Sequence, residues 1–175
     1  MTNDKIRTLQ DVVEIVKRHR KETNGKIITM NGVFDIMHLG HAKALEEVRN
    51  LCGSEDLFIL GVDSDRQVKK RKGSDRPYYS HYDRATLLAR ICPGPHYITI
   101  FDFENCVPFV EAIKPDKHAN GPEYPRPWIE EETVLRYGGE LYTYKRYKDI
   151  DGNDYSTSNL INKILKSQEL LKGEQ

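Results

Sequence analysis

The fold of this chain is decided near its start, by the stretch Lys26-Ile27-Ile28-Thr29-Met30-Asn31-Gly32-Val33-Phe34-Asp35-Ile36-Met37-His38-Leu39-Gly40-His41. Its first five residues form an apolar run that predicts a buried strand. A turn follows, and apolar residues then recur at helical spacing from Ala42 to Cys52, with Gly53 as a stop signal. His38 and His41 therefore lie at a strand-to-helix junction, where a first helical turn points both imidazoles the same way.

This junction has the features of a phosphate site. Gly40 removes a side chain where phosphates need to approach the backbone, and a helix N-terminus offers free N–H groups and a positive dipole end. Zinc is the other use of paired histidines, but it needs a third and a fourth ligand. Cys52, Cys92 and Cys106 are widely spaced and form no C-x-x-C pair, so the sequence favours phosphate over zinc.

Length and composition limit the class of protein. The 175 residues suffice for one domain, expected over 1–175, with a substantial core. The 27 basic and 27 acidic residues cancel, so we expect neither a nucleic-acid nor a membrane partner, and any anion site must be local. Three cysteines without a disulfide pattern suit the cytoplasm. Met1–Lys21 is too polar for a signal peptide, and the longest apolar run, Leu57–Val62, is too short to cross a bilayer.

Strand and helix patterns alternate along the chain. Short runs typical of strands lie at 26–30, 57–62, 97–101 and 140–144, and a weaker strand pattern lies near 117–119. The first helical pattern begins at Thr8, which together with Asp11 resembles a capping box. Further helical patterns lie at 42–52, 80–91, 106–113, 128–137 and 156–171. The last of these is expected to turn Leu160, Ile164 and Leu165 inward. This alternation predicts an α/β fold, a Rossmann-like doubly wound parallel sheet of about five strands with helices on both faces. Ligands bind such sheets beyond the carboxyl ends of the strands, at the switch in strand order.

A basic run, Lys69-Lys70-Arg71-Lys72, follows the second predicted strand. Runs of charge are usually solvated surface. This one adjoins the turn-rich loop 73–77, which could fold over a polyanion, and the rest of the chain is close to neutral. We therefore treat the run as a candidate phosphate contact.

Two further features have both a structural and a functional interpretation. Ser156-Thr157-Ser158 opens the last predicted helix, where one hydroxyl would suffice as a cap and three also suit a phosphate. Arg84, in the first turn of the 80–91 helix, is either a surface charge or a clamp whose fork binds two phosphate oxygens.

The sequence offers no evident nucleophile. It contains no G-x-S-x-G motif, no Walker loop and no cysteine paired with a histidine in sequence. Phosphates gripped by histidines, lysines and a helix terminus instead fit direct displacement at phosphorus, in which positioning and charge stabilisation do most of the catalysis.

The 31–41 stretch, together with the 156–158 helix start, resembles the cytidylyltransferase-like nucleotidyltransferase superfamily. Further matches lie at 62–65, 72–77, 83–84 and 138–140, so the resemblance covers most of residues 8–165. Within the superfamily the chain is most similar to the adenylyltransferase domain of bacterial ADP-heptose synthases. That resemblance implies transfer of AMP from ATP to a sugar phosphate such as heptose 1-phosphate, with Mg²⁺ and release of pyrophosphate. Asn120 stands where the heptose enzymes typically carry a lysine.

The resemblance also implies roles for particular residues. His38, His41 and Lys72 would be catalytic, with the histidines stabilising charge on the transferred phosphate. The nucleotide would be bound by Gly32, Phe34, Asp35, Gly40, Arg84, Ser156, Thr157 and Ser158. The acceptor phosphate would be bound by Lys69, Lys70, Asn120 and Gly121. No carboxylate cluster is evident for the metal, so Mg²⁺ would be held mainly by triphosphate oxygens and water. Similar enzymes are often homodimers, which we expect here.

Two alternatives stay open at this point. One is a sister enzyme, a cytidylyltransferase that acts on glycerol 3-phosphate or another small phosphate. However, Asp151 stands where an arginine of the glycerol 3-phosphate enzymes would fall. The other is a nucleotide-binding module without catalysis, against which the intact His38, His41 and 156–158 hydroxyls argue.

Overall fold

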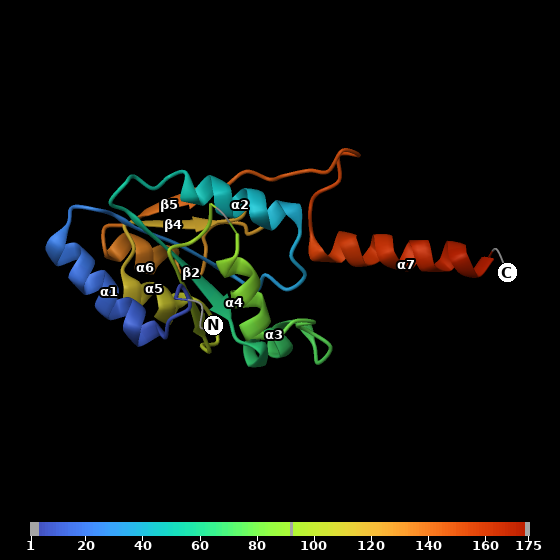
Figure 1. Ribbon diagram of the computed structural model, residues 1–175, viewed down its shortest axis with the longest axis horizontal. Helices are drawn as coiled ribbons and strands as arrows, with labels where there is room; N and C mark the ends of the chain where they lie inside the picture. The colour runs from blue at the N-terminus through green and yellow to red at the C-terminus, as the bar shows by residue number, and fades with distance from the viewer. Residues whose placement is uncertain (1–3, 92, 174–175) are drawn as a thin grey trace.

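The computed structural model describes residues 4–91 and 93–173, so Cys92 lies outside the described residues. Its centre is a five-stranded sheet in the order β3-β2-β1-β4-β5, with every pairing parallel (Figure 1). The strands are β1 (Ile27–Gly32), β2 (Leu57–Asp63), β3 (Tyr97–Phe101), β4 (Lys117–Asn120) and β5 (Glu140–Thr143). The predicted Rossmann-like sheet and all five predicted strands are therefore confirmed.

The switch in strand order falls between β1 and β4. From β1 the chain builds outward to β2 and β3, and then returns to place β4 on the other side of β1. Thr29 of β1 accordingly pairs with Ile59 of β2 on one side and with His118 of β4 on the other. A crevice opens at such a switch because the connections leave the two neighbouring strand ends in opposite directions.

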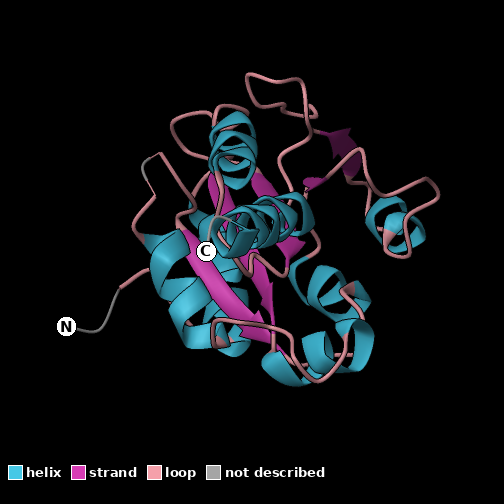
Figure 2. Cartoon of the chain, turned by 90° about the vertical axis from the view of Figure 1, so that its right-hand side faces the viewer, coloured by secondary structure: helices cyan, strands magenta, loops and turns pink. Residues whose placement is uncertain are grey.

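Helices cover both faces of the sheet (Figure 2). One face packs against α2 (Leu39–Arg49) and α4 (His81–Ala89), and the other against α1 (Leu9–Glu22), α5 (Val107–Ile113) and α6 (Glu131–Arg136). Alternate residues of β2 serve the two cores, with Phe58 on the α2 side and Ile59 on the α1 side. Both are fully buried, and burying such side chains stabilises the fold by about 1.5–3 kcal/mol each.

Side-chain caps fix where two of the helices begin. The Thr8 hydroxyl accepts from the backbone N–H of Asp11, whose carboxylate accepts in return from the backbone of Thr8, a complete capping box for α1. The Ser80 hydroxyl accepts from the N–H of Asp83 at the start of α4. Both predicted caps are confirmed.

One helix, α3 (Asp65–Lys72), is absent from the sequence-based prediction. Ser64 caps its N-terminus, and the run Lys69–Lys72 forms its last turn. The basic run is therefore helical, and its cations lie at the negative end of a helix dipole. The pattern gave no sign of this helix because Val68 is the only apolar side chain in it.

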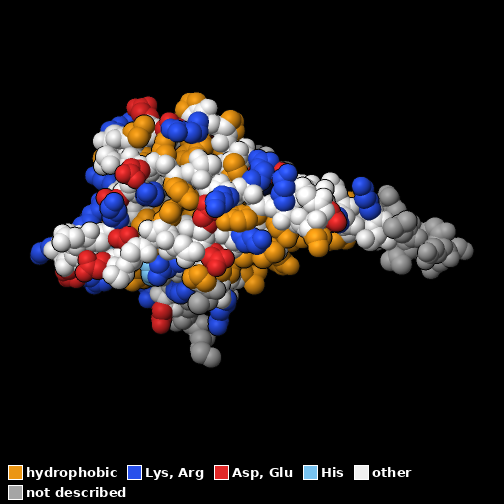
Figure 3. Space-filling view, turned by 90° about the horizontal axis from the view of Figure 1, so that it is seen from above, with side chains coloured by type: hydrophobic (Ala, Val, Ile, Leu, Met, Phe, Trp, Pro, Cys, Tyr) orange, Lys and Arg blue, Asp and Glu red, His pale blue; other side chains and the backbone are white. Residues whose placement is uncertain are grey.

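The last helix, α7 (Thr157–Gly173), projects from the body of the molecule (Figure 1). Ile164 is 57% exposed and Leu165 is 51% exposed, so the prediction that they pack inward is wrong. The reason is that α7 leaves the body from its first turn, and hydrophobic side chains lie along one side of the projecting segment where it departs (Figure 3). Within the described part of the chain, no helix combines the length and the apolar character needed to span a membrane.

Candidate active site

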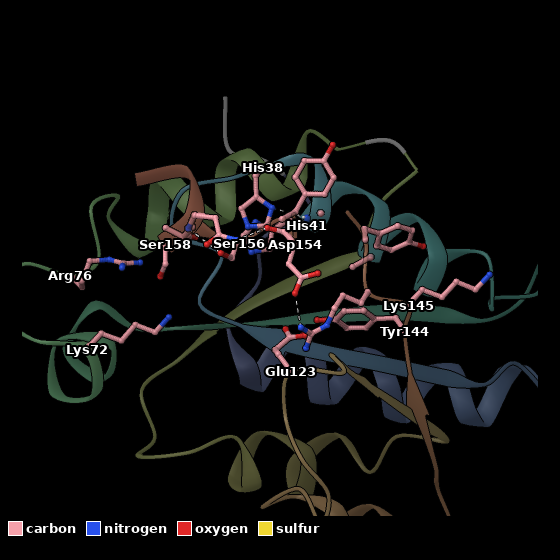
Figure 4. Close-up of a pocket in the computed structure, with 17 residues that line it drawn as sticks. His38, His41, Lys72, Arg76, Glu123, Tyr144, Lys145, Asp154, Ser156 and Ser158 are labelled. Atoms are coloured by element: carbon pink, nitrogen blue, oxygen red, sulfur yellow. Dashed lines mark hydrogen bonds and ion pairs between the residues drawn. The ribbon is translucent and has the colours of Figure 1, made fainter. Parts of the chain in front are cut away.

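A cavity of about 350 Å³ lies at the carboxyl edge of the sheet. Its walls come from the start of α2, the end of α3, the segment 144–156 after β5, and the first turn of α7 (Figure 4). Of the residues predicted from the sequence, it brings together His38, Gly40, His41, Lys72, Ser156, Thr157 and Ser158. The β1 turn with Gly32, Phe34 and Asp35 lines a smaller adjoining cavity of about 100 Å³, which His41, Lys72 and Thr157 share.

The two histidines stack on each other at the start of α2. Their ring centroids are 3.7 Å apart with planes tilted by 20°, as the H-x-x-H spacing predicted. His38 caps the helix, because its Nδ1 accepts from the backbone N–H of His41 at 3.4 Å. Phe34, in a left-handed backbone conformation with φ of 52°, places its ring edge-on to His41 with centroids 5.4 Å apart.

The surroundings keep both histidines neutral. Burial, with smaller contributions from His38 and Lys72, lowers the pKa of His41 to about 3. Burial also lowers the pKa of His38. At neutral pH each ring therefore carries one N–H, which can donate to an anion without bringing a positive charge.

Gly40 is needed for the packing of a neighbouring segment. A Cβ at this position would lie 2.5 Å from the Cβ of Tyr155 and 3.1 Å from Nδ1 of His38. The sequence-based interpretation assigned the missing side chain to phosphate approach. The structure adds a second reason, because the segment that leads into α7 crosses the histidines at this point.

Lys72 and Arg76 point toward the cavity in Figure 4. Burial, followed by the nearby Arg76, lowers the pKa of Lys72. Arg76 is paired through Nε to Oδ2 of the buried Asp35 at 2.6 Å. The other Asp35 oxygen accepts from the backbone N–H groups of Tyr78 at 2.8 Å and Tyr79 at 3.1 Å. Asp35 therefore fixes the loop that carries Arg76, and its carboxylate is occupied by the protein.

The structure does not bring Arg84 to the cleft, so the predicted phosphate clamp is wrong. Its side chain is fully buried, and its guanidinium donates to the carbonyls of Val33, Tyr79 and Asp63 and to the carboxylate of Asp65. Through these four acceptors the guanidinium joins α4 to the turn after β1, the end of β2 and the start of α3, so its role is structural. Lys69 and Lys70 are exposed and line none of the three cavities described for this edge.

The predicted acceptor side has its own, larger cavity of about 710 Å³. Asn120 lines it, whereas Gly121 is buried and does not line it, and a Cβ at Gly121 would clash with the Glu123 carboxylate. The larger cavity shares Asn31, Gly32 and Val33 with the small cavity, and Lys72 lines all three. The cleft is therefore continuous, and Lys72 stands where its chambers meet.

Several lining residues were missed from the sequence. On the histidine side they are Ala44, Arg76, Glu123, Tyr144, Lys145, Arg146, Tyr147, Asp154, Tyr155 and Asn159. Most belong to loops without a motif, so periodicity gave no sign of them. One signal was available, because Tyr144 directly follows the carboxyl end of β5, on the edge where ligands bind in this class of sheet.

Comparisons with known proteins identify the family of the chain. Residues 29–163 match the model of the cytidylyltransferase-like family. The chain belongs to this family. The resemblance seen in the sequence is thereby confirmed, and the matched range includes both the histidine pair and the 156–158 hydroxyls.

Curated relatives are similar over nearly the whole chain. The Bifunctional protein HldE of Syntrophotalea carbinolica is 33% identical over 164 residues, or 93% of this chain and 31% of that protein. HldE of Helicobacter pylori strain J99 is 34% identical over 93% of this chain and 32% of that relative. HldE of Geotalea uraniireducens is 35% identical over 91% of this chain and 31% of that relative. The chain thus spans about a third of the length of these relatives.

Solved structures share the fold. A lipopolysaccharide core biosynthesis protein from Thermoplasma volcanium aligns with a TM-score of 0.56 at 22% identity, over 70% of this chain and 98% of that one. A pantoate-beta-alanine ligase from Francisella tularensis aligns with a TM-score of 0.58 at 10% identity, over 88% and 71%. At these identities the likeness supports the Rossmann-like fold alone.

Proposed function

We propose that this chain is a nucleotidyltransferase that transfers AMP from ATP to a sugar phosphate and releases pyrophosphate. The observation that carries the proposal is the position of Lys72, which lines the histidine-side cavity, the larger cavity and the small one between them. A cation at that junction suits a reaction in which two phosphorylated substrates must meet. Membership of the cytidylyltransferase-like family and the similarity to HldE support the same chemistry.

In this proposal the triphosphate occupies the histidine side and the acceptor the larger cavity. A phosphate oxygen of the acceptor forms a bond to the α-phosphorus of ATP. The bond from that phosphorus to its bridging oxygen breaks, and pyrophosphate leaves with the electron pair. The attacking phosphate is already ionised, so the step needs no general base.

The side chains of the cleft act by position and charge. The neutral imidazoles of His38 and His41 donate N–H groups toward the transferred and departing phosphates, and Lys72 offsets negative charge between the substrates. Thr157, Ser158 and the free N–H groups of the first turn of α7 bind the terminal phosphates. Ser156 already serves the helix, because its hydroxyl accepts from the N–H of Asn159 at 3.1 Å.

Mg²⁺ is proposed to bind together with the triphosphate. Among residues 4–91 and 93–173, no three His, Cys, Asp or Glu side chains are grouped to hold a metal ion. The donors present therefore suit a metal that is bound mainly through phosphate oxygens and water, as this ion often is. It would supply charge neutralisation on the triphosphate.

The test is a substrate screen. Purified chain is incubated with ATP, CTP or GTP and with sugar 1-phosphates, including heptose 1-phosphate, or glycerol 3-phosphate, and pyrophosphate release is measured. We expect release with ATP and a sugar 1-phosphate. Turnover of CTP with glycerol 3-phosphate alone would replace the proposal with the cytidylyltransferase alternative, and nucleotide binding without turnover of any pair would favour the non-catalytic module.

We further propose a homodimer in the cytoplasm. The exposed Ile164 and Leu165 on the projecting α7 support self-association, since apolar side chains on an extended helix are often buried by a partner. Sedimentation equilibrium measures the mass directly. A monomer at tens of micromolar would contradict the dimer.

A further inference from the structure

The larger cavity differs in character from the histidine side. One wall is apolar and aromatic, built by Tyr124, Pro125, Pro127, Trp128 and Ile129. Polar groups face it from the strand ends, including Asn31 on β1 and Asn120 on β4. Apolar walls with a few polar groups are typical of sites that orient a small organic molecule.

The amide of Asn120 is locked at both ends. Its Nδ2 donates to Oε1 of Glu130 at 3.0 Å, and its Oδ1 accepts from the backbone N–H of Gly121 at 2.9 Å. An ionised carboxylate only accepts and a backbone N–H only donates, so the amide cannot flip. The second Nδ2 hydrogen and the second Oδ1 lone pair are therefore held in fixed directions.

A buried hydrogen-bonded chain holds Glu130 in turn. Its Oε1 also contacts Nε2 of His118 at 3.2 Å, and Nδ1 of that ring lies 2.7 Å from the hydroxyl of Thr29. Glu130 is 2% exposed, and His118 and Thr29 are fully buried. Polar groups in such places are costly unless each is satisfied, and a satisfied network fixes the orientation of its members.

Charged side chains around this cavity bear on what Asn120 can bind. The Glu130 carboxylate lies 3.0 Å from Nδ2 of Asn120, and Glu130 lines the cavity as well. Asp63, another lining residue, is paired to Arg71 at 2.9 Å. Lys72 lines both this cavity and the histidine side. A phosphate at Asn120 would face the Glu130 carboxylate at close range, whereas a neutral hydroxyl there can both accept from and donate to the locked amide.

We infer that Asn120 binds a hydroxyl of the acceptor sugar, and that the acceptor lies with its phosphate toward Lys72 and its hydroxyls toward the Asn120–Glu130 pair. This inference rests on the proposed function and adds the orientation and the chemical class of the acceptor. Asn120 is then a specificity-determining residue, and Glu130 is a positioning residue that acts through it. The sequence-based assignment of Asn120 to the acceptor phosphate is replaced by a hydroxyl contact.

The first experiment compares Asn120→Ala with the parent chain, using ATP and the sugar 1-phosphate that gives turnover in the screen. We expect the KM for the sugar phosphate to rise at least tenfold, while the KM for ATP stays within twofold. Inorganic phosphate, used as a competitor of the sugar phosphate, should retain its inhibition constant in Asn120→Ala and lose potency in Lys72→Ala. Asn50→Ala, an exposed asparagine at the end of α2, is the matched control and should change none of these values.

Monodeoxy analogues of that sugar phosphate identify the hydroxyl. For the parent chain, one analogue should have a KM raised as much as the KM of the intact sugar phosphate is raised by Asn120→Ala. For Asn120→Ala itself, that analogue and the intact sugar phosphate should have the same KM. The other analogues should lose the same factor in both proteins. A variant that discriminates every hydroxyl as the parent does would overturn the contact.

Glu130→Gln tests the positioning role. A glutamine can present either its oxygen or its nitrogen to Asn120, so the amide is no longer locked. We expect the KM for the sugar phosphate to rise about three- to tenfold, with kcat at saturating acceptor and the KM for ATP within twofold of the parent. If this buried substitution unfolds the chain, Thr29→Val removes the far end of the same network and should raise the same KM by a smaller factor.

The possible outcomes separate the two proposals. Transfer to a sugar phosphate with an unchanged acceptor KM in Asn120→Ala overturns the inference and leaves the proposed function standing. A weaker inhibition constant for inorganic phosphate in Asn120→Ala returns this residue to phosphate binding and also overturns the inference. Absence of transfer to every sugar phosphate by the parent chain overturns the proposed function, and the inference with it.

Discussion

The imidazoles of His38 and His41 stack at the start of α2, with ring centroids 3.7 Å apart. Two protonated rings at that separation would repel each other, and burial already disfavours charge on both. The pair therefore presents two neutral donors in a fixed relative orientation. Preorganised donors of this kind act on the charge that develops during phosphoryl transfer.

Replacing His41 with Ala should damage turnover far more than folding. Loss of one donor aimed at developing charge typically lowers kcat by about 100-fold or more. Steady-state kinetics and thermal melting are measured on the same preparations, with His38→Ala as an independent test of the other ring. Near-parental kcat in His41→Ala would remove this ring from the mechanism.

His41 should also make stability depend on pH. Its pKa is about 3 in the folded chain and near 6.5 when unfolded, so between these values the unfolded state binds a proton that the folded state does not. The free energy of unfolding contributed by this group is therefore fully present above pH 6.5 and falls as the pH drops toward 3. In His41→Asn the slope between pH 4 and 6 should decrease by up to about 1.4 kcal/mol per pH unit, measured by denaturant unfolding. Parallel curves for parent and variant would contradict this assignment.

Arg84 should matter for stability and little for substrate affinity. Arg84→Ala leaves the carbonyls of Val33 and Asp63 and the Asp65 carboxylate without their partner, which should lower the free energy of unfolding by about 3–5 kcal/mol. Arg90→Ala, an exposed arginine that ends the same helix, should change it by no more than about 0.5 kcal/mol. A parental melting temperature together with a raised KM for ATP would restore the phosphate clamp.

Local sequence patterns were sufficient to predict the sheet but not every part of the site. β1, β2 and β3 contain short apolar runs between turn signals, and the parallel order of the sheet follows from alternation with helices. β4, with the sequence Lys-His-Ala-Asn, gave only a weak signal. Arg84 could not be placed, because its burial depends on acceptors from two segments distant in sequence, Val33 and the Asp63–Asp65 stretch. The histidine pair was predictable because three-residue spacing and a strand-to-helix junction are both local. The exposure of α7 was not predictable, because the spacing of apolar residues identifies an apolar face of a helix but does not show which part of the protein covers it.

The Thr157 hydroxyl is expected to bind the triphosphate, because Ser156 already provides the cap of α7. Thr157→Val removes a hydrogen bond with little change in volume and should weaken the apparent affinity for ATP by roughly tenfold, with the melting temperature of the free chain unchanged. Melting with and without ATP measures this, since a ligand stabilises only a protein that can bind it. A variant that gains as much stability from ATP as the parent would show that the hydroxyl binds no nucleotide. Ser156→Ala, which removes the cap, is the comparison.

The carboxylate of Glu47 on α2 anchors the segment that follows β5. It accepts from the hydroxyls of Tyr142, at 2.8 Å, and Tyr147, and from the backbone N–H of Lys145, at 3.1 Å. These contacts tie residues 145–155, which form one wall of the histidine-side cavity, to the helix that carries the histidines. The anchor is outside the cavity lining, so its effect on substrates must be indirect.

Glu47→Ala should therefore loosen that wall without removing a group from the cleft. We expect the KM for ATP to rise about three- to tenfold and hydrogen exchange in residues 145–155 to become faster. The acceptor KM should stay close to that of the parent, because none of residues 145–155 lines the larger cavity. Glu46→Ala, the exposed neighbour on the same helix, is the matched control and should leave both the exchange and the KM values unchanged. Faster exchange with an unchanged KM for ATP would mean that nucleotide binding does not depend on this wall. Tyr147→Phe removes only one of the anchoring hydrogen bonds. Its KM for ATP and its hydrogen exchange in residues 145–155 should lie between those of the parent and those of Glu47→Ala.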